Sequence, residues 1–324
     1  MDRVNGIKSP ESECYDVSIV VPLNNEELNL RPLLDKINSA LSMSGKTFEV
    51  IFVNDGSTDD SEQILKQIYS QTKNVTVINL FRKKGKASAL EAGMGYTRGR
   101  YIVTLDADLQ YDPDDIPMMI NELEKGSDAV SGNRLARGDK RSVIITSLFF
   151  NYIIRKLTGL NFKDFFSGLK CFKREVIDFL SLYGDLYRFA VIFACKQNFI
   201  VKEVPIRHYP RSKGNSKYTG FKRSGLAVLD IIAVLLTVTF NENVAYYAGL
   251  IGAFLIAWGT FFLSFSLFNH FLSLTGLSFR LGIIFAFFGI QLLLLKKISN
   301  DFFYRHQREQ LKRKNNIKEI LIRK

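Results

Sequence analysis

The sequence predicts an α/β domain followed by a helical membrane hairpin, and three observations support this. Short apolar runs alternate with helical patterns over the first hundred residues, the order of a doubly wound fold. Val244 to Ser266 then forms an uncharged stretch of 23 residues, long enough to cross a bilayer as a helix. Basic clusters flank this apolar region. The 324 residues therefore have room for one substantial domain and a smaller appendage.

Four apolar runs in the first domain are typical of buried strands. They are Val17–Pro22, Phe48–Asn54, Val75–Leu80 and Tyr101–Leu105. A helical pattern follows the first run and ends near Ser42, and further helical patterns separate the other runs. In such sheets ligands bind at the carboxyl ends of the strands. The residues directly after each run are therefore candidates for a functional site.

The loops after these runs carry opposite charges. The first, second and fourth runs are followed by PLNNEE, NDGSTD and DADLQ, and the third is followed by RKKGK. Carboxylates and cations at one sheet edge suit a metal-bound diphosphate. Asp106 and Asp108, separated by one small residue, can share a divalent cation with phosphate oxygens, which predicts magnesium or manganese. By itself such a DxD pair is weak evidence, because many solvated loops contain one.

The formal charge of +12 is concentrated beside the apolar region. Five basic residues and no acidic ones lie between Arg211 and Arg223, and Lys296 to Lys324 holds ten basic against three acidic residues. This arrangement favours a membrane surface over nucleic acid as the partner. The cysteines lack CxxC spacing and the histidines are scattered, which argues against a disulfide framework and a zinc site. The polar N-terminus lacks the apolar core of a secretory signal, so the first domain is expected in the cytosol.

Two transmembrane spans are predicted, at about 244–266 and 277–295. Leu226 to Phe240 is apolar but shorter and contains Asp230, which predicts an interfacial helix. Two spans keep both basic clusters on the cytoplasmic side. The expected organisation is a cytosolic domain at 1–222, an interfacial helix at 223–243, a transmembrane hairpin at 244–298 and a basic cytoplasmic tail at 299–324. A second candidate for the bilayer surface is Phe149 to Leu157, which basic residues flank.

A family resemblance rests on six segments in this order: VVPLNNEE, VNDGSTD, DADLQ, SGNR, DFFSGLKCF and RSKGNSKY. Together they resemble the dolichol-phosphate mannose synthase and polyprenyl-phosphate glycosyltransferase branch of glycosyltransferase family two, over roughly residues 17 to 240. The resemblance implies a GT-A fold at the plasma membrane. It also implies an inverting, metal-dependent transfer of a hexose from a UDP-glucose or GDP-mannose type of donor to undecaprenyl or dolichyl phosphate. The sugar, the nucleotide, the prenyl chain and a homo-oligomeric state stay open.

The resemblance further implies site residues by motif position. The nucleotide-sugar would contact Pro22, Asn24, Glu26, Val53, Asp55, Lys86, Asp106, Ala107, Arg211 and Lys217. The metal would be held by Asp106, Asp108 and Gln110, and the catalytic residues would be Asp106, Asp108 and Arg134. The acceptor phosphate would contact Arg134, Arg141, Ser167 and Lys170. The family usually carries an aromatic residue where Asn24 stands, so a ring contact to the base is missing or replaced.

Two questions about roles stay open. Arg211 and Lys217 suit either a substrate phosphate or anionic lipid, and the two roles can coexist. Some bacterial relatives carry an Asp where this chain has Gly168, so that candidate base is absent. Asp164 is the carboxylate nearest to Gly168 in the sequence, and it is either a helix or turn cap or a functional residue. A phosphate monoester is largely dianionic at neutral pH and needs no base to become a nucleophile.

Two other functions are the alternatives to this hypothesis. A processive polysaccharide synthase should carry a QxxRW motif, but Trp258, the single tryptophan, lies inside the first predicted span. A non-catalytic protein that binds nucleotide-sugar or lipid is the other rival. The presence of Asp106, Asp108 and Arg134 argues against it.

Overall fold

The computed structural model describes residues 15–135, 141–180, 189–210, 242–268, 280–294, 297 and 317–322 of the chain. The chain divides into two compact units. The first consists of Met1–Ser224 and Gln310–Lys324, and the second of Gly225–Glu309. The predicted interfacial helix at 223–243 lies outside the described residues as far as residue 241.

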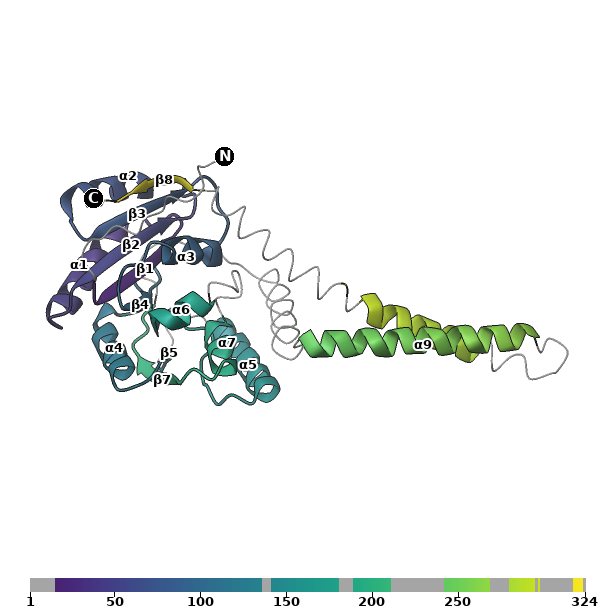
Figure 1. Cartoon of the computed structure of the whole chain (residues 1–324). Coiled ribbons are helices and arrows are strands. Elements are labelled where there is room, and N and C mark those ends of the chain that lie inside the picture. Colours follow the sequence, from purple (N-terminus) through teal and green to yellow (C-terminus); the bar gives the residue numbers. More distant parts are fainter. Residues whose placement is uncertain are drawn as a thin grey trace, which may run out of the picture. The chain divides into compact units, whose positions relative to one another are not determined.

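Within the described residues, the first unit is built around an eight-stranded sheet of order β7-β5-β6-β4-β1-β2-β3-β8 (Figure 1). The strands are β1 (Val17–Leu23), β2 (Phe48–Asn54), β3 (Val75–Leu80), β4 (Tyr101–Thr104), β5 (Ala129–Arg134), β6 (Lys170–Lys173), β7 (Val201–Ile206) and β8 (Ile317–Leu321). The four strands predicted from the sequence are confirmed, each within one residue of its predicted ends.

Helices connect the strands and pack on the sheet. In chain order they are α1 (Leu30–Ser42), α2 (Ser61–Gln71), α3 (Lys86–Met94), the 3-10 helix η1 (Pro113–Asp115), α4 (Ile116–Glu124), α5 (Arg141–Thr158), α6 (Arg174–Leu180) and α7 (Ala190–Lys196). Leu30, Leu33, Ile37 and Leu41 form the buried stripe of α1, at the spacing of one helical face. The polar residues between them remain toward water.

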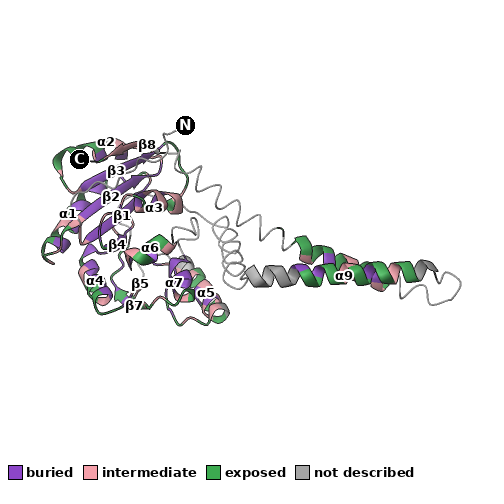
Figure 2. Ribbon diagram, in the orientation of Figure 1, coloured by how far each residue is buried: buried purple, intermediate pink, exposed green. Residues whose placement is uncertain are grey.

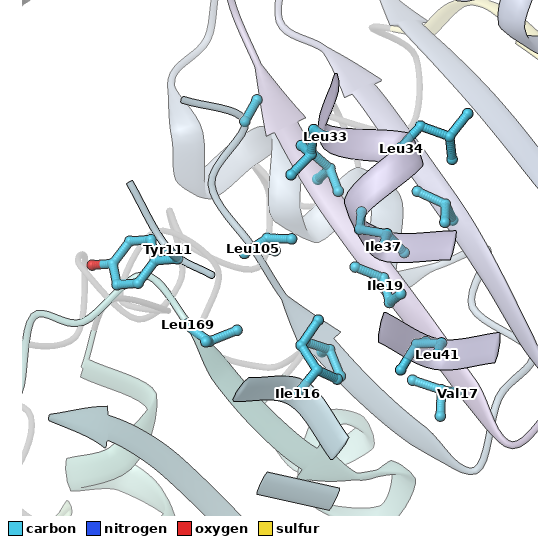
Figure 3. Packing of buried hydrophobic residues seen from close by; sticks show 14 of the residues in the cluster. Val17, Ile19, Leu33, Leu34, Ile37, Leu41, Leu105, Tyr111, Ile116 and Leu169 are labelled. Atoms are coloured by element: carbon cyan, nitrogen blue, oxygen red, sulfur yellow. The ribbon is translucent and has the colours of Figure 1, made fainter. Parts of the chain in front are cut away.

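The central strands are buried on both faces. Every residue of β1, β3 and β4 is buried, which explains why these strands are almost continuous apolar runs. Figure 2 shows the buried strands between helices whose outer faces are exposed. In Figure 3, Ile19 of β1 and Ile37 of α1 belong to one cluster, and Tyr111 stands at its edge with its hydroxyl turned away from the other labelled side chains.

The sheet is mixed. Strands β4, β1, β2 and β3 are parallel neighbours, as the doubly wound expectation requires, whereas β6 runs antiparallel to both β4 and β5. Thr104 at the end of β4 therefore pairs with Lys170 at the start of β6. Because β5 and β7 are parallel to each other, their last residues, Arg134 and Ile206, reach the same edge. This topology brings the loops after β4, β5 and β7 to the segment before β6.

A strand near the C-terminus completes the sheet beside β3. The sequence predicts only a basic tail at 299–324, but Ile317–Leu321 forms β8, antiparallel to β3. Leu321 packs against the core cluster of the domain. Five residues that follow the apolar region are thus part of the α/β unit.

Helix α5 has an exposed apolar surface. Ile145, Leu148, Phe149 and Tyr152 are exposed large side chains on this helix. Its last turn carries two basic residues, Arg155 and Lys156.

The second unit contains α9 (Glu242–Phe268) and a helix of residues 280–294, which lie alongside one another in Figure 1. Glycines allow their close approach: a Cβ at Gly252 would lie 2.9 Å from the carbonyl oxygen of Gly289, and one at Gly259 would lie 2.9 Å from that of Gly282. Large apolar side chains such as Phe254 and Phe287 are exposed. Among the helices in the described part of the chain, none has the combination of length and apolarity needed to cross a membrane.

Candidate active site

The acidic DADLQ loop follows β4 and turns sharply. Leu109 has a positive φ of 59°, and the Asp108 carboxylate accepts a hydrogen bond from the backbone N–H of Gln110 at 3.3 Å. Asp108 is almost fully buried, whereas the side chain of Asp106 is 26% exposed. Lys86, the first residue of α3, forms an ion pair with Asp106. Lys86, which comes from the neighbouring basic loop, thus pairs with Asp106, the more exposed of the two carboxylates.

The turn offers oxygen donors that fit a hard divalent cation. Asp106 and Asp108 supply carboxylates within one turn, and Gln110 supplies an amide oxygen. No cluster of three or more His, Cys, Asp or Glu side chains suited to a metal occurs among the described residues. Two carboxylates match the ligand pattern in which magnesium or manganese is shared with substrate phosphates rather than held by the protein alone.

The loop after β2 is held by the loop after β3. Asp55 is buried, and its carboxylate accepts hydrogen bonds from the backbone N–H groups of Lys84 at 2.6 Å and Gly85 at 2.8 Å. Gly56 has a positive φ of 61°, and a Cβ there would lie 2.5 Å from the backbone nitrogen of Lys83. The close crossing of these loops therefore requires glycine. Asp55 thus holds the backbone of the basic loop, and Lys86, which follows this backbone, pairs with Asp106.

Asn24 links the loop after β1 to the loop after β2. Its side-chain amide donates to the carbonyl oxygens of Asp55 at 2.8 Å and Gly56 at 3.3 Å. The residue that stands where the family usually has an aromatic ring therefore makes loop contacts in this structure. Glu26, two residues further along the loop, is buried, and its carboxylate accepts from Asn29 at 2.7 Å.

Pro22 and Val53 face each other in the parallel pairing of β1 with β2. Val53 has no exposed surface, and its side chain lies against Gly93 of α3, where a Cβ would approach it to 2.8 Å. Ala107, between the two metal-ligand candidates, is also buried. The side chain of Val53 contributes to packing of the sheet, unlike the polar residues at the strand ends.

Gly168, in the segment before β6, lies directly against the acidic turn. A Cβ at this position would be 2.4 Å from Asp106 Oδ2 and 2.9 Å from a ring carbon of Tyr111. The backbone N–H of Gly168 donates to the Tyr111 hydroxyl at 2.7 Å, and its carbonyl accepts from Thr104 at 3.1 Å. Burial raises the pKa of Tyr111, which keeps the phenol protonated. An acidic side chain at Gly168 does not fit this arrangement.

Arg134 and Asp164 form a buried, two-pronged ion pair. Arg134 Nε lies 2.6 Å from Asp164 Oδ2, and Nη2 lies 3.0 Å from Oδ1. Asp164 is fully buried and also accepts from the backbone N–H of Phe166 at 3.2 Å. The carboxylate therefore both caps a local turn and orients a candidate phosphate-binding arginine.

Lys170 is the other buried cation of this region. Its ammonium group donates to the carbonyl oxygen of Ser167, and both residues are buried. Burial lowers the pKa of Lys170 to about 7, with further lowering by Lys86 and opposing effects of Asp164 and Asp106. Ser167 and Lys170 lie on either side of Gly168 along the segment that contacts Asp106, which places these two acceptor candidates beside the acidic turn.

The side chains of three site residues expected from the sequence lie outside the described part of the structure. Arg211 and Lys217 lie outside the described residues. Arg141 is the first residue of α5, and its side chain is likewise not described.

The segment after β7 is a part of the site that the sequence did not indicate. Arg207 bonds the buried carboxylates of Asp112, at 3.1 Å, and Asp115, at 3.0 Å. Tyr209 donates its backbone N–H to the carbonyl oxygen of Gln110 at 2.8 Å. One sequence signal could have indicated Arg207: the run of acidic residues after DADLQ needs a cation close by. These contacts hold Arg207 and Tyr209 beside the acidic turn.

Comparison with known families gives one matching description. The sequence model of glycosyl transferase family 2 matches residues 18–181. This range contains the acidic turn, the Arg134–Asp164 pair and β6.

Curated relatives cover most of the chain. A dodecaprenyl-phosphate galacturonate synthase of Rhizobium johnstonii is 31% identical over 257 residues, covering 78% of this chain and 75% of the relative. An undecaprenyl-phosphate 4-deoxy-4-formamido-L-arabinose transferase of Shewanella sediminis is 32% identical over 246 residues, covering 76% of this chain and 74% of the relative.

Solved structures share the fold. Glucosyl-3-phosphoglycerate synthase of Mycobacterium tuberculosis with Mn2+, UDP and phosphoglyceric acid has a TM-score of 0.54 at 21% identity, covering 69% of this chain and 78% of that one. The same enzyme with Mn2+ and UDP-glucose has a TM-score of 0.53 at 20% identity, covering 69% of this chain and 79% of that one.

Proposed function

The chain belongs to glycosyltransferase family 2, with an α/β fold of the GT-A type, and from this premise we propose that it transfers a hexose from a nucleotide-sugar to a polyprenyl phosphate. The observation that carries the proposal is the contact of Gly168 with Asp106. It joins the acidic turn, expected to serve the donor diphosphate, to the segment of the acceptor candidates. The names of the similar relatives, dodecaprenyl- and undecaprenyl-phosphate transferases, support a prenyl phosphate acceptor.

The proposed reaction is a single in-line displacement. An oxygen of the acceptor phosphate attacks the anomeric carbon, the bond from that carbon to the nucleoside diphosphate breaks, and the configuration inverts. The acceptor is largely dianionic at neutral pH, so no proton has to be removed. The absence of room for a carboxylate at Gly168 agrees with a reaction that needs no base there.

The side chains divide between the two substrates. Arg134, oriented by Asp164, would bind the acceptor phosphate with its guanidinium, and Lys170 adds positive charge behind it. On the donor side Asp55, Asn24 and Glu26 would hold the nucleoside. Lys86 would move from Asp106 toward the donor phosphates.

A divalent cation, magnesium or manganese, would be held by Asp106, Asp108 and Gln110, and when bound it supplies positive charge to the departing diphosphate. Structures of similar fold contain Mn2+ with UDP, which supports a divalent metal. The proposed donor is of the UDP-glucose or GDP-mannose type.

The proposal places the enzyme at the plasma membrane, with the catalytic domain and both termini cytoplasmic. The hairpin would use spans at about 244–266 and 277–295. Exposed apolar side chains on α9 and the helix of residues 280–294, and glycines at their contact, support this. The exposed apolar residues of α5 would rest on the same lipid surface. Resistance of the protein to carbonate extraction from membranes tests the anchor; extraction into the soluble fraction contradicts it.

The test of function is a substrate panel with the purified protein. UDP- and GDP-sugars are offered with Mg2+ or Mn2+ to undecaprenyl phosphate, dolichyl phosphate and 3-phosphoglycerate. The product is identified by mass spectrometry, and its anomeric configuration is determined by NMR. We expect a prenyl-phosphate sugar of inverted configuration, lost on adding EDTA. A sugar on phosphoglycerate alone would overturn the acceptor class, and retained configuration would overturn the displacement.

A further inference from the structure

The strand β8, near the C-terminus, touches the donor side of the active-site edge. It pairs with the last residues of β3, with Asn79 opposite Glu319 and Leu80 opposite Ile317, and the register shifts between these pairs. The basic loop starts directly after β3. A strand from the far end of the sequence therefore supports the strand from which this loop emerges.

A chain of side-chain hydrogen bonds runs from β8 toward the loop after β2. Glu319 accepts from the side-chain amide of Asn79 at 3.3 Å, and Asn79 Oδ1 accepts from Asn54 Nδ2 at 3.0 Å. Asn54 Oδ1 then accepts from the backbone N–H of Ser57 at 3.0 Å. Asn54 and Asn79 are both at most 2% exposed, so water does not substitute freely for these partners.

The carboxylate at one end sets the direction of every bond in the chain. An ionised carboxylate only accepts hydrogen bonds, whereas an Asn side chain can present either its oxygen or its nitrogen. Glu319 therefore draws the amide nitrogen of Asn79 toward itself, which turns the oxygen of Asn79 toward Asn54. Asn54 in turn must point its nitrogen at Asn79 and its oxygen at Ser57.

Ser57, the last residue of this chain of hydrogen bonds, lies where the donor loops meet. Ser57 Oγ accepts from the backbone N–H of Asn25 at 2.9 Å, which ties the loop after β1 to the loop after β2. Two residues before Ser57, Asp55 holds the backbone of Lys84 and Gly85. A loosened Ser57 would disturb contacts among three loops.

We propose that Glu319 is a positioning residue for the nucleotide-sugar, acting through Asn79 and Asn54 on the loop at Ser57. This rests on the proposed function, because it takes these loops as the donor site. Glu319 itself lies on a strand at the edge of the sheet and does not touch the substrate.

Kinetics of the full-length enzyme test the proposal. Glu319→Ala is expected to raise the donor KM about fivefold, the effect of one lost hydrogen bond, with kcat and the acceptor KM unchanged. Glu319→Gln keeps an oxygen for Asn79 and should restore a donor KM close to that of the wild type. Lys66→Gln is the matched control, because Lys66 pairs with Glu319 at 3.5 Å on the surface but is outside the chain to Ser57. Its donor KM should not change.

A second pair of variants tests the direction of the bonds. Asn79→Asp places two acceptors opposite each other and should raise the donor KM, whereas Asn79→Asp with Glu319→Gln restores a donor to the pair and should lower the KM again. A lowered Tm with unchanged donor KM in Glu319→Ala would overturn the proposal, as would a double variant no better than Asn79→Asp. Absence of transfer by the wild type across the substrate panel would instead overturn the proposed function.

Discussion

The donor half and the acceptor half of the active-site edge are held together by different kinds of interaction. On the donor half, parallel strands end in loops that are tied together by hydrogen bonds to backbone groups, from the amide of Asn24 and to the carboxylate of Asp55. On the acceptor half, charges are buried: Arg134 with Asp164, and Lys170 beneath Ser167. The antiparallel strand β6 brings these buried groups to the acidic turn.

Because of this difference, mutations in the two halves should have different effects on stability and substrate binding. A neutral hydrogen bond contributes about 1 kcal/mol to stability, whereas removing one partner of a buried ion pair costs about 3 to 5 kcal/mol. Changes in the donor loops should therefore act mainly on substrate binding. Changes on the acceptor half should lower stability and turnover together.

The largest effect is expected at the turn that joins the halves. Asp108→Ala removes one of two carboxylates proposed for the metal and should lower kcat by about a thousandfold at saturating substrates. Asp114→Ala is the control, because Asp114 is an exposed carboxylate in the same acidic segment. Equal turnover of Asp108→Ala and the wild type would remove the acidic turn from the reaction.

A smaller loss is expected where the halves touch. Gly168→Ala pushes a methyl group against Asp106 and Tyr111, and should lower kcat by about a hundredfold because a displacement near 1 Å at a reacting centre has this effect. Gly95→Ala is the matched control, since a Cβ there meets only ordinary contacts beyond 3.5 Å. If both variants kept full activity, the two halves would not need the close contact seen here.

Two buried ion pairs at opposite edges of the sheet allow an effect on catalysis to be separated from an effect on stability. Asp164→Asn breaks the pair at the active-site edge, and Glu49→Gln breaks the Arg98–Glu49 pair near the start of β2. Each should lower the free energy of unfolding by about 3 kcal/mol in denaturant titrations. Only Asp164→Asn should also lower kcat at a temperature where both variants are folded. A similar kcat loss in Glu49→Gln would show that the effect is general destabilisation.

The smallest effect is a pH dependence on the acceptor half. Burial lowers the pKa of Lys170 to about 7, so its positive charge is present below about pH 7 and is lost as the pH rises through that value. The acceptor KM of the wild type should rise several-fold between pH 6 and 8 relative to that of Lys170→Met. Comparing the two proteins cancels the titration of the acceptor phosphate itself. A ratio of KM values that is constant with pH would exclude this role of Lys170.

The outcome of the sequence predictions follows the same division. Strands β1 to β4 were predicted within one residue because buried parallel strands are continuous apolar runs with charged loops after them. The partnership of Arg134 with Asp164 was not predicted, since 30 residues separate them along the chain. Arg207 and Tyr111 were missed for the same reason, and β8 was hidden within a segment that is basic overall.

The sequence by itself determined the family, the positions of four central strands along the chain and the acidic turn, because these depend on local patterns of apolar and charged residues. Tertiary structure alone decided that Gly168 meets Asp106, that Lys170 is buried, and that Glu319 bonds Asn79 of β3. These contacts join segments far apart in the chain. Their existence depends on the direction and register of β6 and β8, which local sequence patterns do not specify.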